Sequence, residues 1–248
     1  MYFWDASKRV MTRHIPNTLT LLNLVCGFAA TICAIKGYSD YASYCIMAGM
    51  VLDFSDGFAA RLLKAYSALG KELDSLADVV TFGIAPGAIL FNLLTAGGMT
   101  GLKAFAVAVI IPAASALRLA KFNNDPSQSS SFKGMATPAS AFTVVSLALA
   151  AELTDCRIYD TMTGSPWFIG ILTFSLAVMM LLNARMFSLK FSNLRWKGNE
   201  ERYLFVTVSL LLLAIFQLAA LPMIMAAYIL ISFLFPVVAG RRTSPGEV

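Results

Sequence analysis

Eight apolar segments dominate the chain, and most are about as long as a helix that crosses a lipid bilayer. They are Asn17–Ile35, Tyr41–Ala59, Leu73–Leu94, Leu102–Leu119, Pro138–Ala151, Trp167–Arg185, Tyr203–Leu218 and Leu221–Ala239. Hydrophobic residues make up 58% of the chain and charged residues only 13%, which excludes an ordinary soluble domain. Only helices satisfy their own backbone groups within hydrocarbon, and the sequence shows no alternating barrel pattern. We therefore predict an all-α polytopic membrane protein with about eight transmembrane helices.

The positive charges indicate how these segments are oriented. Of the 19 lysines and arginines, all but Lys36, Lys103 and Arg157 lie in the N-terminus, in the connections after even-numbered segments, or in the C-terminus. By the positive-inside rule, both termini are expected to be cytoplasmic. The net charge of +5 is therefore a topology signal that suits anionic lipid headgroups, and it does not indicate nucleic-acid binding. The four cysteines have no paired spacing, which argues against disulfides and thiolate metal sites.

Four aspartates gather in the stretch Asp53–Asp78, which joins the second and third apolar segments. On a helix, Asp53 and Asp56 share one face, and Asp74 and Asp78 share a face of the next helix. Carboxylates that face each other across two helix ends repel strongly at low dielectric, so a cation between them is expected. Mg²⁺ and Mn²⁺ prefer such oxygen ligands. The alternative is that these acids merely cap and solvate a cytoplasmic loop.

Other polar and small residues are placed near the aspartates. Gly57 and Ala60 lack bulk on the aspartate face and leave room for a base or ribose, although small residues are also common where helices cross. Arg118 and Lys121 lie three apart at the cytoplasmic end of the fourth segment. They are either positive-inside anchors or a cationic pocket for an acceptor carboxylate or for phosphates.

The first segment carries a polar stripe. Asn17, Thr20 and Asn23 recur at steps of three, either for hydrogen bonding within the helix bundle or because they face the aspartates and bind a nucleotide. Pro16 is predicted at the start of this helix, and Pro86 is predicted to kink the third helix. No small-residue cleavage pattern follows the first segment, so no cleavable signal peptide is expected.

The aspartate stretch resembles the signature of the CDP-alcohol phosphotransferase family: D-x-x-D-G-x-x-A-R, eight residues, then G-x-x-x-D-x-x-x-D. The matching positions are Asp53, Asp56, Gly57, Ala60, Arg61, Gly70, Asp74 and Asp78. Three further strings, DSLADVVTFGIAP, RLAKFN and FKGMATPASA, resemble the phosphatidylserine synthase branch of that family. The chain departs from that branch at Thr81 and Lys121, where serine and arginine are common, and at Met135 and Ala136.

The resemblance implies a membrane-embedded enzyme that transfers a phosphatidyl group from CDP-diacylglycerol to L-serine and releases CMP. It implies a metal site of Asp53, Asp56, Asp74 and Asp78 that holds Mg²⁺ or Mn²⁺, with two ions expected, and makes Asp78 the general base. The CDP moiety would be bound by Asn23, Asp56, Gly57, Ala60, Arg61 and Gly70. The acceptor would be bound by Arg118 and Lys121.

The resemblance also implies an arrangement of the whole chain. A juxtamembrane amphipathic segment (1–14) would precede a six-helix family core (15–200), and a two-helix extension with a tail (201–248) would follow it. We expect a homodimer in the bacterial inner (cytoplasmic) membrane, in contact with membrane lipids, with its active site facing the cytoplasm.

Two alternatives remain open from the sequence. The first is a related enzyme that uses glycerol 3-phosphate or inositol (phosphate) as acceptor, although a phosphorylated acceptor calls for more arginine than Arg118 alone supplies. The second is a cation-coupled or proton-coupled transporter that uses its intramembrane carboxylates. A transporter predicts acids near mid-depth, whereas these acids cluster at the cytoplasmic ends of two consecutive helices.

Overall fold

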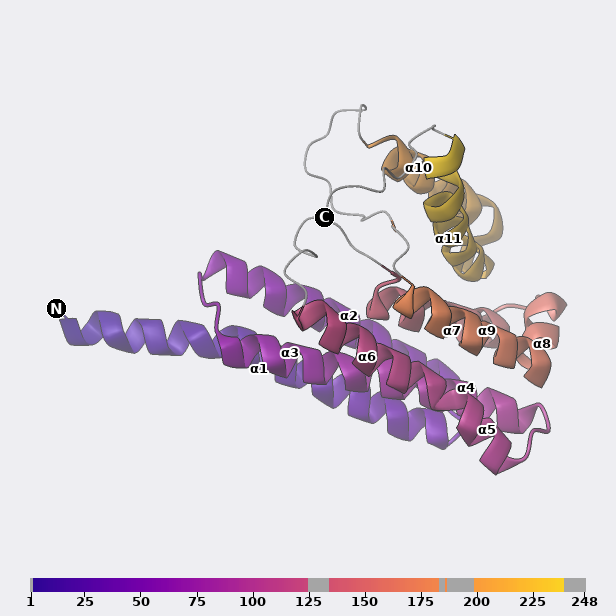
Figure 1. The fold of residues 1–248 in the computed structure, drawn as a ribbon, viewed down its shortest axis with the longest axis horizontal. Coiled ribbons are helices and arrows are strands. Elements are labelled where there is room, and N and C mark those ends of the chain that lie inside the picture. The colour runs from indigo at the N-terminus through magenta and orange to yellow at the C-terminus, as the bar shows by residue number, and fades with distance from the viewer. Residues whose placement is uncertain (1, 125–133, 183–185, 187–198, 239–248) are drawn as a thin grey trace.

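The computed structural model describes residues 2–124, 134–182, 186 and 199–238, and within these ranges the side chains of 14–124, 134–182, 186 and 199–234. Every regular element of the described chain is a helix. Figure 1 shows α1 to α4, α6, α7 and α9 running along one long axis, with α8 turned across one end and the α10–α11 pair above the bundle. The all-α class predicted from the apolar segments is confirmed.

The first two helices form a tightly packed antiparallel pair. α1 (Tyr2–Ile35) and α2 (Ser39–Leu62) are joined by a short turn in which Gly37 adopts a φ of +88°, a conformation that glycine allows at no steric cost. Ala34 and Ala42 beside this turn are fully buried, and their small side chains let the two backbones approach closely.

Pro16 lies inside α1, so the prediction that it begins the first helix is wrong. A proline in a helix interior removes one backbone hydrogen-bond donor and crowds the preceding turn. Helices of membrane proteins tolerate this where side chains and local adjustments satisfy the freed groups. The helix therefore continues through position 16 without a break.

The third predicted segment is a composite helix. α3 (Ala68–Asp78) passes into a π-helical segment, η1 (Val79–Ile84), and then into α4 (Ala85–Ala96). Pro86 is the second residue of α4 and follows directly after η1, inside the composite helix, where its ring and missing N–H disturb regular α-helical bonding. The amide of Ala85 donates to the carbonyl of Val80, five residues back. At the place where a kink was predicted, the helix has a π-helical turn immediately before Pro86.

Five helices follow: α5 (Gly101–Ala108), α6 (Ile110–Asn124), α7 (Thr137–Leu153), α8 (Arg157–Thr163) and α9 (Pro166–Leu181). The connection between the fifth and sixth segments contains α8, which meets α9 at 77°. The polar linker 125–133 and most of the connection before the seventh segment lie outside the described residues.

The last two segments form a helical hairpin. α10 (Glu200–Phe216) and α11 (Ala220–Val238) are separated by one 3₁₀ turn, and Gln217 at the reversal has a φ of +51°. The rings of Phe205 and Tyr228 lie with their centroids 5.8 Å apart. In one straight helix these residues would be about 35 Å apart, so the chain doubles back.

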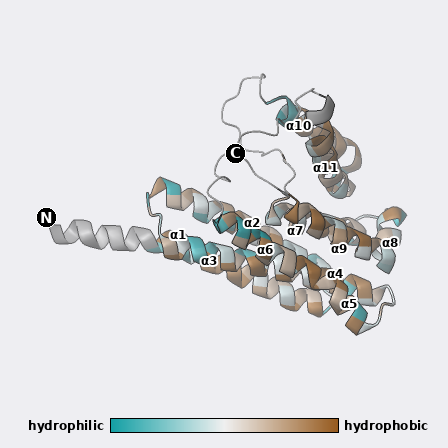
Figure 2. Cartoon of the chain, viewed as in Figure 1, coloured by the Kyte–Doolittle hydropathy of each residue, from teal (hydrophilic) through white to brown (hydrophobic). Residues whose placement is uncertain are grey.

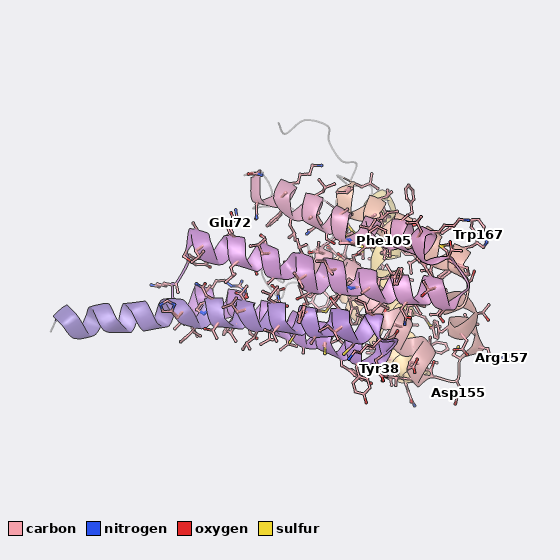
Figure 3. The ribbon with its side chains drawn as sticks, turned by 90° about the horizontal axis from the view of Figure 1, so that it is seen from below. Tyr38, Glu72, Phe105, Asp155, Arg157 and Trp167 are labelled. Carbon is pink, nitrogen blue, oxygen red and sulfur yellow. The ribbon has the colours of Figure 1, made fainter. Side chains whose placement is uncertain are left out.

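Four helical stretches of the described chain are long and apolar enough to cross a membrane, or five if α8 and α9 count as one bent span. One of these stretches, 200–234, is the α10–α11 hairpin and supplies two of the predicted helices. The remaining predicted segments are α2, which carries the acids, and α7, which has 17 residues. In Figure 2 the ribbon is largely brown, that is apolar, along α4, α7, α9 and α11, whereas teal hydrophilic residues stand out on α3 and at the start of α10. Figure 3 shows Tyr38, Asp155, Arg157 and Trp167 towards one end and Glu72 towards the other.

Candidate active site

Three carboxylates meet where α2 ends and α3 begins. The ligand oxygens of Asp53, Asp56 and Asp74 all lie within 4.8 Å of one another. Asp53 and Asp56 share a face of α2 because they are one helical turn apart, and Asp74 comes from the neighbouring helix. The structure therefore brings together three of the four aspartates that the sequence assigned to a metal site.

A short connection holds the two helix ends in place. Lys64 adopts a φ of +51°, which reverses the chain after α2, and the amide of Ala65 donates to the carbonyl of Ala60 at 2.9 Å. Ser67 then caps α3, accepting a hydrogen bond from the amide of Gly70 at 2.9 Å. The N-terminus of α3, with its positive dipole end, thus lies near the carboxylates.

The donor set suits a hard divalent cation. Each aspartate offers carboxylate oxygen, and Mg²⁺ and Mn²⁺ favour oxygen ligands together with retained water. Asp56 is only 5% exposed and Asp53 and Asp74 are half-buried, so solvent screens their mutual repulsion poorly. Carboxylates held this close remain ionised together only if a cation compensates them. The three residues therefore fit a divalent metal.

Asp78 lies one turn further along α3 than Asp74. It is 8% exposed, and its Oδ1 has no hydrogen-bond partner. Its carboxylate is in electrostatic range of the other three aspartates and of Arg118, but it is not a member of the group of three that could share one ion. Its direct part in holding metal stays a prediction.

The polar stripe of α1 faces the same helices. The hydroxyl of Thr20 donates to Oδ2 of Asp56 at 2.5 Å. Asn17 lies beside Gly70: a Cβ added to Gly70 would be 3.1 Å from Oδ1 of Asn17. Asn23 is fully buried beside Gly49, and neither of its side-chain polar atoms has a hydrogen-bond partner. The sequence offered two roles for this stripe, hydrogen bonding within the bundle or facing the aspartates, and it did not predict the particular bond between Thr20 and Asp56.

The residues expected around the nucleotide differ in accessibility. An added Cβ on Gly57 would meet no atom within 4 Å, so open space lies beside this part of α2. Arg61 is exposed, and its Nε donates to the carbonyl of Gly57 at 3.0 Å. Ala60 is half-buried, and Gly70 is confined between Ser67 and Asn17.

The two cations of α6 occupy different environments. Arg118 is 8% exposed, its Nε has no hydrogen-bond partner, and Asp78 is in its electrostatic range. Lys121 is exposed one turn further along the helix. The structure thus brings Arg118 to the aspartates and leaves Lys121 nearer the surface. Its contribution to acceptor binding stays a prediction.

The end of α6 is tied to α3 by residues that the sequence reading did not single out. The side-chain amide (Nδ2) of Asn123 donates to the hydroxyl of Ser75 at 2.8 Å. Nζ of Lys71 donates to the backbone carbonyl of Asn123 at 3.2 Å. Ser75 directly follows Asp74. Asn123 lies in the RLAKFN string, whose resemblance to a family pattern was the available signal.

The π-helical segment packs closely against α1 and α2. An added Cβ on Gly27 would lie 2.4 Å from Oγ1 of Thr81, and one on Gly49 would lie 2.6 Å from its Cγ2. The Thr81 hydroxyl donates to the backbone carbonyl of Asn23 at 3.0 Å. Two glycines therefore admit Thr81 between the first two helices, one turn after Asp78.

Comparison with known proteins gives a consistent picture. The family model of CDP-alcohol phosphatidyltransferase matches residues 13–182. A relative named CDP-diacylglycerol–serine O-phosphatidyltransferase in Bacillus subtilis is 38% identical over 137 residues, covering 54% of this chain and 75% of the relative. A protein of the same name in Helicobacter pylori strain J99 is 32% identical over 219 residues, 87% of each chain.

A third relative of that name, from Mycobacterium leprae, is 34% identical over 173 residues, which is 66% of this chain and 55% of the relative. The family match covers both helices that carry the aspartates, together with the stripe of α1 and Arg118. The chain belongs to the CDP-alcohol phosphatidyltransferase family.

Proposed function

We propose that this protein is a CDP-diacylglycerol–serine O-phosphatidyltransferase, which transfers a phosphatidyl group from CDP-diacylglycerol to the hydroxyl of L-serine and releases CMP. The observation that carries the proposal is the convergence of Asp53, Asp56 and Asp74 beside the buried Asp78 and Arg118. That the three relatives described above share this name supports the choice of donor and acceptor.

Asp53, Asp56 and Asp74 would hold Mg²⁺ or Mn²⁺, and Asp78 is proposed to complete a site for two ions. When bound, the metal neutralises the charge of the pyrophosphate and of the departing CMP. The three aspartates would hold this metal near the C-terminal end of α2. Thr20 orients Asp56 through its hydrogen bond, which is the kind of supporting contact that fixes a ligand in place.

The nucleotide would lie over the accessible end of α2. The space beside Gly57 admits a flat base or ribose close to the backbone, and the exposed guanidinium of Arg61 can reach phosphate oxygens. Ala60 adds little bulk to the neighbouring surface, and Asp56 lies on the metal side. Gly70 and, from α1, Asn23 are also proposed to contact the nucleotide.

Asp78 is proposed as the general base. A serine hydroxyl is a poor nucleophile at neutral pH, so its proton must be removed as it attacks. The Oδ1 atom of Asp78, which has no hydrogen-bond partner, is available to accept that proton. The O–P bond to serine then forms as the bond from phosphorus to the CMP oxygen breaks.

Arg118 and Lys121 are proposed to bind the acceptor. A guanidinium can hold a carboxylate through two parallel hydrogen bonds, and the buried Arg118 is in electrostatic range of the proposed base. The carboxylate of L-serine would therefore be held with its hydroxyl towards Asp78.

We further propose that the protein is a homodimer of the bacterial inner membrane, with both termini and the active site on the cytoplasmic side. The apolar helices make the chain an integral membrane protein. The excess of lysine and arginine at one end supports the orientation. The divisions at residues 14 and 200 remain proposals, and α1 continues across the first of them.

The proposed function is tested by CMP release from CDP-diacylglycerol. Purified protein in detergent with Mn²⁺ is given L-serine, glycerol 3-phosphate or inositol in separate reactions. We expect L-serine to give the fastest release and phosphatidylserine to appear in equal amount. Faster release with either of the other two acceptors would refute the serine assignment.

A further inference from the structure

Two faces of α3 point to different neighbours. Asp74 lies with Asp53 and Asp56 of α2, and the ligand oxygens of the three all lie within 4.8 Å of one another. Ser75 is the next residue along α3, so its side chain projects about 100° further around the helix. Its hydroxyl accepts a hydrogen bond from Nδ2 of Asn123 in α6, at 2.8 Å. Both faces belong to one helix, so the contact with α6 also sets the direction of Asp74.

A second hydrogen bond joins the same face of α3 to the same residue of α6. Lys71 precedes Ser75 by one helical turn, and its Nζ donates to the backbone carbonyl of Asn123 at 3.2 Å. The Ser75 hydroxyl also donates to the carbonyl of Lys71, at 3.2 Å. Asn123 therefore bonds α3 at two points one turn apart, which restricts rotation of the helix about its axis more than a single point would.

This restraint matters because burial does little to hold the first two turns of α3. The buried residues of the helix are Ala77 and Asp78, both in its last turn, whereas Leu69 and Leu76 are 70% and 64% exposed. The aspartates of α2 repel the carboxylate of Asp74 when no cation lies between them. The contact with α6 opposes that displacement before any metal binds.

We infer that Asn123 is a positioning residue of the metal site: through its hydrogen bond to Ser75 it holds α3 in the rotation that directs Asp74 to the aspartates of α2. The inference rests on the metal site of the proposed function, and it gives α6 a part in metal binding. Ligands that are already in place bind more tightly than ligands that must first be ordered. Loss of the bond therefore weakens metal binding and leaves the chemistry of the occupied site unchanged.

Equilibrium binding of Mn²⁺ to purified, metal-free protein, followed by electron paramagnetic resonance, tests the inference. Asn123→Ala removes the side-chain amide and keeps the backbone carbonyl that Lys71 contacts. We expect this variant to bind Mn²⁺ about fivefold more weakly than wild type, the scale of one lost hydrogen bond. Once Mn²⁺ is saturating, its kcat for CMP release should lie within about twofold of wild type.

Asn124→Ala is the matched control, because it removes the neighbouring side-chain amide. Nδ2 of Asn124 donates to the carbonyl of Ala120 within α6 itself, at 3.0 Å. We expect the Mn²⁺ affinity of this variant to equal that of wild type. Equal weakening in both variants would overturn the inference, because the effect would then come from a loosened end of α6. Normal Mn²⁺ affinity in Asn123→Ala would overturn it directly.

Ser75→Ala breaks the same hydrogen bond from the side of α3. If the two residues act through this bond, the double variant binds Mn²⁺ no more weakly than Asn123→Ala alone. Two losses of affinity whose free energies add would contradict the inference. If Asn123→Ala does not fold, Ser75→Ala decides: weaker Mn²⁺ binding supports the inference, and normal binding overturns it.

Amide hydrogen exchange of the metal-free protein gives a readout that does not depend on the ion. Exchange within α3 should be faster in Asn123→Ala than in wild type and unchanged in Asn124→Ala. Equal exchange in α3 of all three proteins would contradict the inference. A raised KM for L-serine with normal Mn²⁺ affinity in Asn123→Ala would also overturn it, because Asn123 would then act on the acceptor.

Failure of the inference can be told apart from failure of the proposed function. If wild-type protein binds Mn²⁺ but releases CMP with another acceptor and not with L-serine, the serine assignment fails and the role of Asn123 is still decided by its Mn²⁺ affinity. If wild-type protein binds no Mn²⁺, the metal site fails and the inference fails with it. A serine-dependent wild type with an unaffected Asn123→Ala overturns the inference alone.

Discussion

At the residue scale, Asp78 differs from the other three aspartates. It is buried, one of its oxygens has no hydrogen-bond partner, and it stands outside the group that could share one ion. We predict that Asp78→Asn still binds CDP-diacylglycerol but loses turnover by about 10²-fold or more, the scale of a lost general base. Donor binding and CMP release should be measured on the same preparation. Wild-type turnover in this variant would remove Asp78 from the mechanism.

Thr20 is the second residue whose role can be isolated. Its hydroxyl donates to Asp56, a proposed metal ligand, and valine has nearly the same shape without the hydroxyl. We predict that Thr20→Val weakens activation by Mn²⁺ by about 10-fold to 100-fold, as the loss of an orienting contact to a ligand typically does.

Thr20→Ser keeps a hydroxyl at this position and is the matched control. It should retain most of the wild-type Mn²⁺ dependence. If valine and serine at position 20 behave alike in a Mn²⁺ titration of activity, the Thr20–Asp56 contact has no part in holding metal.

At the scale of elements, the packing of the π-helical segment against α1 and α2 depends on two glycines. Any side chain at Gly27 or Gly49 would meet Thr81 at less than 3 Å, and at Gly27 the Thr81 backbone itself lies 2.7 Å away. Such a conflict forces helices apart, which typically costs about 1–3 kcal/mol. We predict that Gly27→Ala lowers the thermal unfolding midpoint and also lowers kcat, because Asp78 lies one turn from Thr81.

Gly170 provides the control for this prediction. It lies within α9, and an added Cβ there would meet no atom within 4 Å. Gly170→Ala should leave the protein as stable as wild type or slightly more so, because alanine favours helix over glycine by up to about 1 kcal/mol. Equal unfolding midpoints for the two variants would contradict the close packing of α1 against η1.

The elements also show why the sequence predicted some features and not others. Hydropathy located most of the helices, because a helix that crosses a bilayer needs about 20 consecutive, mainly apolar residues. The spacing of Asp53 and Asp56 predicted a shared face because helical periodicity is a local property. The π-helical turn and the Thr20–Asp56 bond depend on how separate helices meet. No local pattern encodes that geometry.

The same limit explains the errors and the omissions. Pro16 was placed at a helix start because proline is common there, but the helix simply extends further back. Thr20 and Asp56 lie 36 residues apart along the chain, so only the folded structure brings the two together.

At the scale of the whole molecule, the topology can be tested with the cysteines of the chain. Cys156 lies between α7 and α8, at the end of the bundle that carries Asp155 and Arg157 (Figure 3). We predict that a membrane-impermeant maleimide labels Cys156 in intact cells. When Cys156 is replaced by serine and an exposed cysteine is placed at the opposite end, as in Tyr66→Cys, labelling should require permeabilisation. The reverse pattern would show that the protein is inserted with the aspartates outside.

The central claim is that Asp53, Asp56 and Asp74 together hold a divalent cation. It is tested most directly by equilibrium binding of Mn²⁺ to purified protein, followed by electron paramagnetic resonance. Asp74→Asn should bind Mn²⁺ at least about tenfold more weakly than wild type, because it removes one carboxylate ligand. Glu72→Gln is the matched control, since Glu72 is an exposed acid two residues away on the same helix (Figure 3), and it should bind normally. Equal Mn²⁺ affinity in wild type and Asp74→Asn would contradict the account.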